Sequence, residues 1–180
     1  MILPFSTKLN GKPTYFVEKI HKSFRIKEVN LKAAIDPTIH YTKDYNFVAK
    51  DKLAAKIHTI REDKNDRWKP GTMIDFFINT RTKDMFRFAP RIPVVSVQKF
   101  EIKWGLCKTI ATIFIDDVDY ATFKNYNDGF GYRDLYYPNS IPARGFSFIG
   151  NDGFDSKEDF LTYFNQDFTG KIIHWTDKKY

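Results

Sequence analysis

Cysteine is almost absent from this sequence, since Cys107 is the only one among 180 residues. A single cysteine excludes an internal disulfide and any metal site built from several thiolates, and it is typical of a reducing compartment. Long apolar runs are also absent, and the start of the chain, residues 1–5, shows neither a basic leader nor a hydrophobic segment of signal-peptide length. We therefore expect a cytoplasmic protein with no membrane segment.

Metal-ligand patterns are missing as well. The chain has four histidines, and their spacing does not match that of a metal site: His21, His40, His58 and His174. The adjacent carboxylates Asp116 and Asp117 end a predicted strand, which favours a solvated turn over a carboxylate site. The sequence therefore predicts neither a bound metal nor a cofactor.

Aromatic residues, by contrast, are abundant, with 18 phenylalanines and 10 tyrosines. Such side chains suit β-strands and stacking surfaces better than a helical bundle. The length is enough for one core but small for two. We expect a single α+β domain over residues 1–180, with insertions at about 25–50, where periodicity is weak, and at 119–145, where turn-forming residues gather.

The net charge of +7 favours an anionic partner. The charges are unevenly distributed, because residues 81–108 carry seven Lys or Arg against two acidic residues, whereas residues 112–160 carry four against nine. A solvated surface of mixed charge would give the same pattern, so both interpretations stay open.

Hydrophobic periodicity predicts the elements of the amino-terminal part. Residues 2–5 form an expected strand, and a turn at residues 10–13 leads into a helix with Pro13 near its first turn. Residues 54–56 resemble the end of a helical turn, and a strand is expected over residues 58–61. The first helix is indicated by apolar residues at helical spacing: Phe16, Val17, Ile20 and Phe24.

In one of the later predicted strands the apolar residues switch from one face of the strand to the other. Val95 and Val97 fall on one face of the stretch 92–104, whereas Phe100 and Ile102 fall on the other, so we expect a β-bulge near residues 98–99. Further strands are predicted from alternation or β-forming composition at three places: residues 74–78, 109–115 and 171–175.

A carboxyl-terminal helix is expected to begin after Ser156, which is a good N-cap residue. Asp159 stands three positions later, where a capping box normally has Glu, and apolar residues follow at helical spacing from Phe160. This assignment places Asp152 in the loop just before the helix.

The segment Lys56 to Arg61 concentrates an amine, an imidazole, a hydroxyl and a guanidinium. On an uninterrupted strand Lys56 and Thr59 would point to opposite faces, whereas a turn between them would bring both to one pocket. Arg61 is suited to bidentate contact with phosphate or carboxylate. His58 has the opposite parity from Thr59, which favours a core or pocket role over metal binding.

This segment resembles the signature of the ASCH domains, relatives of the PUA fold, which runs Gly-x-Lys-x-x-(Glu or Thr)-x-Arg. The matching residues are Lys56, Thr59 and Arg61, with Ala54 in place of the glycine. The resemblance implies a PUA-like, curled β-barrel flanked by helices. It extends to three further elements: a Lys-Pro-Gly turn at 69–71, an Asp-Gly-Phe-x-Ser element at 152–156 and a last strand ending in His174-Trp175.

One branch of the ASCH family removes the acyl group from N(4)-acetylcytidine with a Lys, a Thr and a Glu. The resemblance implies Lys56 and Thr59 as catalytic residues, with Asp152, which is shorter than Glu, as the acidic member. Threonine is a poor nucleophile until a base takes its proton, so the pKa of Lys56 would need to fall to roughly 7 or 8. A carboxylate in contact with the Lys56 amine would oppose that fall.

Three functions remain open at this point. The first is binding of RNA or of a modified nucleoside or nucleotide, with Arg61 on phosphate, Trp68 stacked on a base near Arg67, and His58 beside the ligand. The second is the amidohydrolase activity. The third is a non-enzymatic interaction module, of phage or mobile-element origin, that binds a protein through residues 119–145.

Overall fold

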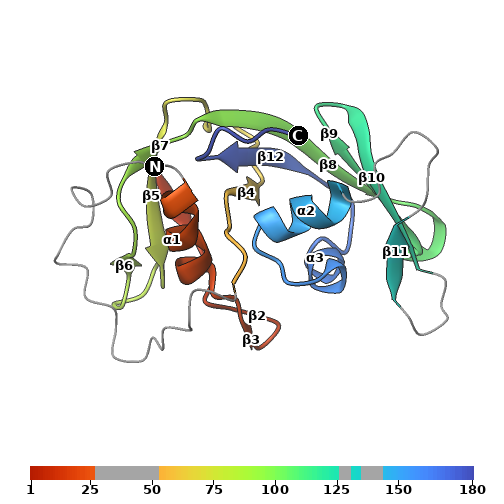
Figure 1. Ribbon diagram of the computed structural model, residues 1–180, viewed down its shortest axis with the longest axis horizontal. Helices are drawn as coiled ribbons and strands as arrows, with labels where there is room; N and C mark the ends of the chain where they lie inside the picture. Colours follow the sequence, from red (N-terminus) through yellow and green to blue (C-terminus); the bar gives the residue numbers. More distant parts are fainter. Residues whose placement is uncertain (27–52, 126–130, 135–143) are drawn as a thin grey trace.

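The computed structural model describes residues 1–26, 53–125, 131–134 and 144–180. These residues confirm the predicted α+β class, with most strands gathered in two sheets (Figure 1). A 3-10 turn at Leu106–Lys108 joins β8 to β9. The helices and strands in chain order are β1 (Ile2–Pro4), β2 (Lys8–Leu9), β3 (Lys12–Pro13), α1 (Phe16–Ile26), β4 (His58–Arg61), β5 (Met73–Ile78), β6 (Phe86–Arg87), β7 (Ile92–Pro93), β8 (Ser96–Trp104), β9 (Ile110–Ile115), β10 (Val118–Asn125), β11 (Tyr132–Asp134), α2 (Arg144–Asn151), α3 (Lys157–Tyr163) and β12 (Phe168–His174).

The larger sheet is antiparallel, with the strand order β11-β10-β9-β8-β12-β4. It curls around α2 and α3 (Figure 1). Phe100 and Ile102 of β8 are fully buried in one cluster with Phe148 of α2 and Phe160 of α3. Within the described residues β4 has no strand on its other side, so its free edge is open to ligands and side chains.

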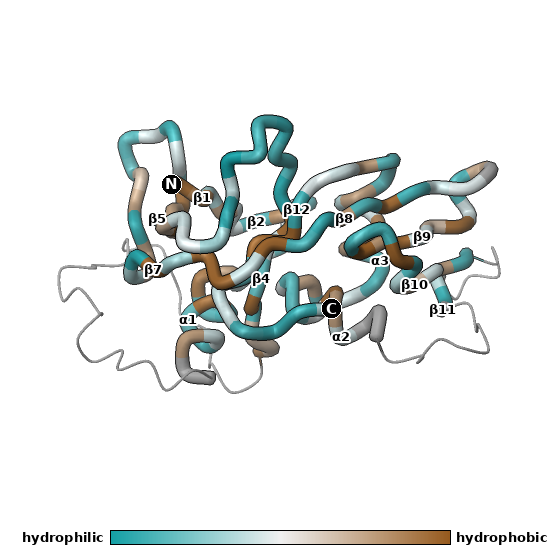
Figure 2. Tube along the Cα trace, turned by 90° about the horizontal axis from the view of Figure 1, so that it is seen from above, coloured by the Kyte–Doolittle hydropathy of each residue, from teal (hydrophilic) through white to brown (hydrophobic). Residues whose placement is uncertain are grey.

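The smaller sheet is built around β5, which pairs with β1 in parallel and with β6 and β7 in antiparallel orientation. The predicted apolar stripe of α1 is buried against it, because Val17, Ile20 and Phe24 share a cluster with Phe76 and Phe88. Figure 2 shows hydrophilic loops around the hydrophobic stretches of the sheets. The structure thus has two cores, and β4 lies between their helices (Figure 1).

Several predicted elements are confirmed. The strands expected at residues 2–5, 58–61, 74–78, 109–115 and 171–175 correspond to β1, β4, β5, β9 and β12. Ser156 caps α3, because its Oγ accepts a hydrogen bond from the Asp159 N–H at 3.0 Å and donates one to the Asp159 carboxylate at 2.9 Å. Asp152 therefore lies between α2 and α3.

Two predictions near the amino-terminal helix are wrong. Residues 54–56 are not helical, because the Lys56 N–H donates to Lys19 O at 3.0 Å and the Ile57 N–H donates to Asn151 O at 2.9 Å. These long-range partners replace the hydrogen bonds of a helical turn and hold the chain extended. Pro13 lies in β3, and α1 begins three residues later at Phe16.

The bulge predicted at residues 98–99 is also wrong, since β8 pairs with β12 without a change of register. The chain instead moves from one sheet to the other at Val94 and Val95, whose N–H groups donate to Thr72 O at 2.8 Å and to His174 O at 2.8 Å. Val97 packs against the core of the smaller sheet, whereas Phe100 and Ile102, on the other face of β8, are buried in the core of the larger sheet.

The stretch 119–145, expected to be an insertion, contains regular secondary structure where the structure describes it. β10 and β11 form an antiparallel pair, and α2 begins at Arg144. The β-forming residues Tyr120, Thr122 and Phe123 explain the strand. The insertion expected at about 25–50 lies almost wholly outside the described residues. No helix among the described residues is long and apolar enough to cross a membrane.

Candidate functional site

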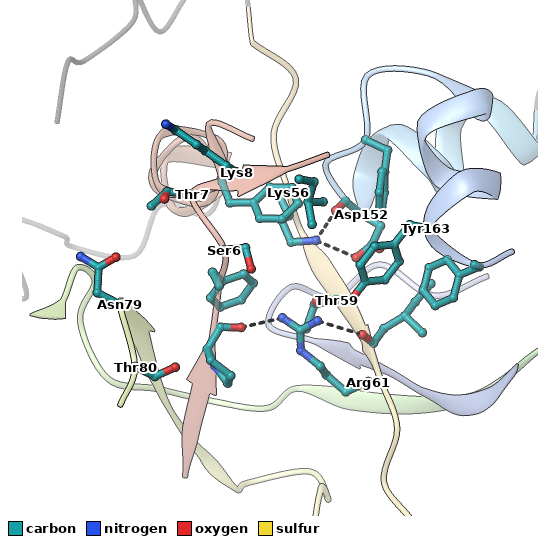
Figure 3. Close-up of a pocket in the computed structure, with 17 residues that line it drawn as sticks. Ser6, Thr7, Lys8, Lys56, Thr59, Arg61, Asn79, Thr80, Asp152 and Tyr163 are labelled. Carbon is teal, nitrogen blue, oxygen red and sulfur yellow. Dashed lines mark hydrogen bonds and ion pairs between the residues drawn. The ribbon is translucent and has the colours of Figure 1, made fainter. Parts of the chain in front are cut away.

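A pocket of about 590 Å³ lies at the free edge of β4. This volume falls in the range of small-molecule sites. Its walls come from the β1–β2 segment, from β4 and the residues just before it, from the turn after β5, and from the loop and helix around α3. Four residues singled out in the sequence line it: Lys56, Thr59, Arg61 and Asp152 (Figure 3).

Lys56 and Asp152 form a buried ion pair at the floor of the pocket. Their exposed fractions are 1% and 3%, and the Lys56 Nζ donates to Asp152 Oδ1 at 2.7 Å and to the Asp152 backbone oxygen. The Lys56 amine also lies 4.7 Å from the centre of the Phe16 ring. This contact joins two residues that lie 96 positions apart in the sequence.

Burial moves both ionisation equilibria of this pair toward the neutral forms. It lowers the pKa of Lys56 from 10.5 to about 8, although the Asp152 carboxylate opposes the change. It also raises the pKa of Asp152 above its usual range, although the Lys56 amine opposes that change. A part of the Lys56 amines is therefore neutral at slightly alkaline pH.

The lowered pKa of Lys56 predicts a pH effect on stability. Between about pH 8 and 10.5 the unfolded chain holds a proton on Lys56 that the folded protein lacks, so the free energy of unfolding rises with pH. We expect a rise of about 3 kcal/mol at most from this residue. Urea unfolding at several pH values measures it, with Lys56→Met as the comparison, because the other lysines contribute equally to both proteins. Parallel pH profiles would contradict the prediction.

Arg61 is fixed against one wall of the pocket. Its Nη2 donates to Pro4 O at 2.7 Å, its Nη1 donates to Ile60 O at 3.3 Å, and its guanidinium carbon lies 5.3 Å from the centre of the Phe5 ring. Burial lowers the pKa of Arg61, but arginine stays charged at neutral pH. The pocket thus holds a pre-oriented cation.

Thr59 lines the pocket although only 2% of its surface is exposed. Among the described residues no hydrogen bond joins the Lys56 amine to the Thr59 hydroxyl, because the amine is directed to Asp152. In this state Lys56 is an ion-pair partner and Thr59 presents its hydroxyl to the pocket.

The other three predicted ligand residues do not line the pocket. His58 is fully buried behind it and contacts Phe148. Trp68, only 4% exposed, belongs to the core of the smaller sheet. Arg67 is exposed in the loop after β4, with its Nε 3.9 Å from Asp63 Oδ1.

The structure brings other residues to the pocket that the sequence did not reveal. Tyr163 lies on α3 with 47% of its surface exposed, in ring contact with Phe154. Lys8, Asn79 and Thr80 lie on the opposite wall (Figure 3). No spacing in the sequence marks them, because the turn after β5 and the β1–β2 segment meet only in the fold.

Gly153 links the pocket floor to α1. It has a φ of +89°, and an added Cβ would lie 2.9 Å from Lys56 Cδ and 3.0 Å from Phe16 Cε1. Its carbonyl accepts a hydrogen bond from the buried Lys19 amine at 2.8 Å. The loop carrying Asp152 therefore requires glycine at this position.

Replacing Gly153 with Ala is expected to lower the free energy of unfolding by about 1–3 kcal/mol. The cause is the positive φ together with the contacts that the new methyl group would make. Urea denaturation measures the change. Gly150→Ala is the matched control, because nothing lies within 4 Å of its added Cβ and alanine favours the helix there. Equal stabilities for the two variants would contradict the prediction.

Comparison of the chain with protein-family models, with curated proteins and with solved structures found no match. In the described ranges no group of three or more His, Cys, Asp or Glu side chains could hold a metal ion.

Proposed function

We propose that this protein binds a nucleotide, free or within single-stranded RNA, in the pocket along β4. The observation that carries the proposal is that exposed aromatic surface and an excess of cations meet in one pocket. Lys8, Lys56 and Arg61 line it, and Asp152 is the one carboxylate among its described lining residues. A phosphate needs the cations, and a base needs an aromatic face.

The arrangement of these groups suggests how the ligand lies. The exposed ring of Tyr163 offers a stacking face on α3, and Arg61 offers guanidinium donors close by (Figure 3). The Thr59 hydroxyl and the Asn79 amide both donate and accept, which suits the edge of a base or a sugar. The resemblance to ASCH domains supports the same ligand class, and we extend the proposal to a PUA-like fold.

Tyr163→Ala is expected to weaken nucleotide binding about tenfold to a hundredfold, because stacking contributes roughly 1–3 kcal/mol per base. Tyr163→Phe keeps the ring and is expected to bind within about threefold of the unchanged protein. Calorimetric titration with cytidine monophosphate and with a four-nucleotide single-stranded RNA tests this. Binding that is unaffected by loss of the ring, or no binding of either ligand at millimolar concentration, would contradict the proposal.

A second candidate is hydrolysis of an N(4)-acylated cytidine. It is favoured by the lowered pKa of Lys56, about 8, in the same pocket as the Thr59 hydroxyl. For this reaction the substrate would have to draw the Lys56 amine from Asp152 toward Thr59, so that the amine takes the hydroxyl proton as Thr59 attacks the amide carbonyl. Lys56 would then return the proton to the N(4) amine as the C–N bond breaks, and water would release the acyl group from Thr59. Turnover of N(4)-acetylcytidine that disappears in both Lys56→Ala and Thr59→Ala would support it. Absence of turnover for any acyl-cytidine would exclude it.

A further inference from the structure

His58 lies behind the pocket, within a chain of buried polar groups. Its Nδ1 is 3.1 Å from the Tyr180 hydroxyl, and its Nε2 is 4.0 Å from Asp152 Oδ1. The ring is fully buried and stacks on Phe148 with centroids 5.2 Å apart. Its Nε2 has no hydrogen-bond partner among the described residues. A buried polar atom of this kind calls for an explanation.

The partners of Tyr180 determine which nitrogen of His58 carries the proton. Asn151 Nδ2 donates to the Tyr180 hydroxyl at 2.8 Å, so this contact uses the oxygen as an acceptor. The hydroxyl proton then has the His58 Nδ1 as its acceptor. We therefore assign His58 Nδ1 as the unprotonated acceptor, which leaves the Nε2–H group facing Asp152. Burial holds the pKa of His58 well below 6.5, so the ring is neutral.

We propose that His58, held in this tautomer by Tyr180, is a positioning residue that keeps the Asp152 carboxylate ionised against the Lys56 amine. The Nε2–H dipole points its positive end at the carboxylate across 4.0 Å. The ionised carboxylate in turn favours the ammonium form of Lys56. The effect of His58 on the charge of the pocket floor does not require a ligand. It rests on the proposed function only for its consequence, which is a change in the affinity for nucleotide.

Other groups act on the same atoms. The Lys56 amine, Arg61 and the Ile60 N–H favour the ionised form of Asp152. Arg61 and Lys19 face Lys56 and disfavour its ammonium form. His174, Lys56 and Lys178 face His58 and keep it neutral. Loss of the Tyr180 hydroxyl would free His58 to protonate Nδ1 and turn a lone pair toward Asp152. The carboxylate would then take up a proton more readily, and Lys56 would lose its counter-ion.

The test is to titrate Lys56 in the full chain. NMR of lysines labelled with ¹³C at Cε reports its protonation at each pH. The unchanged protein is expected to titrate at about pH 8. In Tyr180→Phe and in His58→Phe we expect the midpoint to fall by about one unit, so that the protonated fraction at pH 8 falls from about one half to about one tenth. His58→Gln, whose amide N–H can point at Asp152, is expected to return the Lys56 midpoint most of the way to its value in the unchanged protein.

A purely structural role for His58 would lower stability but leave the Lys56 midpoint in place. An unchanged midpoint in Tyr180→Phe overturns the proposal, and so does a His58→Gln protein that titrates like a folded His58→Phe protein. Tyr132→Phe is the control, because it also removes a phenol hydroxyl but one that contacts Lys108 O, away from the pocket. None of these outcomes depends on whether a nucleotide binds, so failure here is distinct from failure of the proposed function.

Discussion

Asp152→Asn is expected to lower the free energy of unfolding by about 1–2 kcal/mol at neutral pH, because the buried Lys56 loses its counter-ion and gives up its proton, which costs about 1.4 kcal/mol at pH 7 for a pKa of about 8. Lys56 is 1% exposed and its amine donates to Asp152 Oδ1 at 2.7 Å, so the charge cannot reach water without opening the pocket floor. Urea denaturation at pH 7 gives the change directly. A loss below about 1 kcal/mol would show that the pair is solvated.

Two controls separate the charge from the packing. The double variant with Lys56→Met and Asp152→Leu removes both charges and is expected to recover most of the lost stability, because apolar replacements of buried pairs are often neutral or better. In Asp152→Asn alone the penalty should shrink as the pH rises to about 8 and above, because Lys56 of the folded protein then loses its proton and no longer needs a counter-ion. A penalty that does not change with pH would point to packing instead.

Arg61→Ala is expected to weaken binding of nucleotides about tenfold to a hundredfold, since hydrogen bonds to charged groups contribute roughly 1.5–3 kcal/mol. The guanidinium is already oriented by Pro4 O and Ile60 O, so little ordering remains for the ligand to impose. Arg61→Lys is expected to recover only part of the affinity, because an ammonium group lacks the planar fork. Titration calorimetry at two salt concentrations measures both variants.

Thr59→Ala is the matched control for this prediction, because Thr59 lines the same pocket without a charge. If the protein only binds, the loss of its hydroxyl should change affinity by less than about tenfold. For single-stranded RNA, Arg61→Ala should also reduce the salt dependence by about one phosphate contact. Unchanged salt dependence with weaker binding would place the phosphate elsewhere on the protein.

The spacing of apolar residues predicted α1, β5 and α3, because each buries a regular stripe or carries a recognisable cap. The resemblance to ASCH domains also put Asp152 in the same expected site as Lys56, without deciding whether the two are in contact. The sequence did not predict the extended backbone at Lys56, which is set by the carbonyl of Lys19 and by the hydrogen bond from Ile57 to Asn151. Helix and strand propensities depend on the local sequence, so they do not predict hydrogen-bond partners that are distant in the chain.

Helix α2 was missed for a related reason. Its sequence, RGFSFIGN, contains two glycines, which lower helix propensity. The helix forms because Phe148 and Ile149 are buried at 0% and 1% exposure against the curled sheet. The choice of Trp68 as the stacking residue failed in the same way, since only the fold shows that Trp68 is in the core and that Tyr163 is exposed at the pocket.

The central claim is that a nucleotide binds in the pocket along β4. It is tested most directly by NMR titration of the labelled protein with cytidine monophosphate and a four-nucleotide single-stranded RNA at moderate salt. We predict that resonances of Thr59, Arg61, Asn79 and Tyr163 shift together with one dissociation constant, because all four line one pocket. Shifts confined to other surfaces, or no shifts at millimolar ligand, would contradict the account.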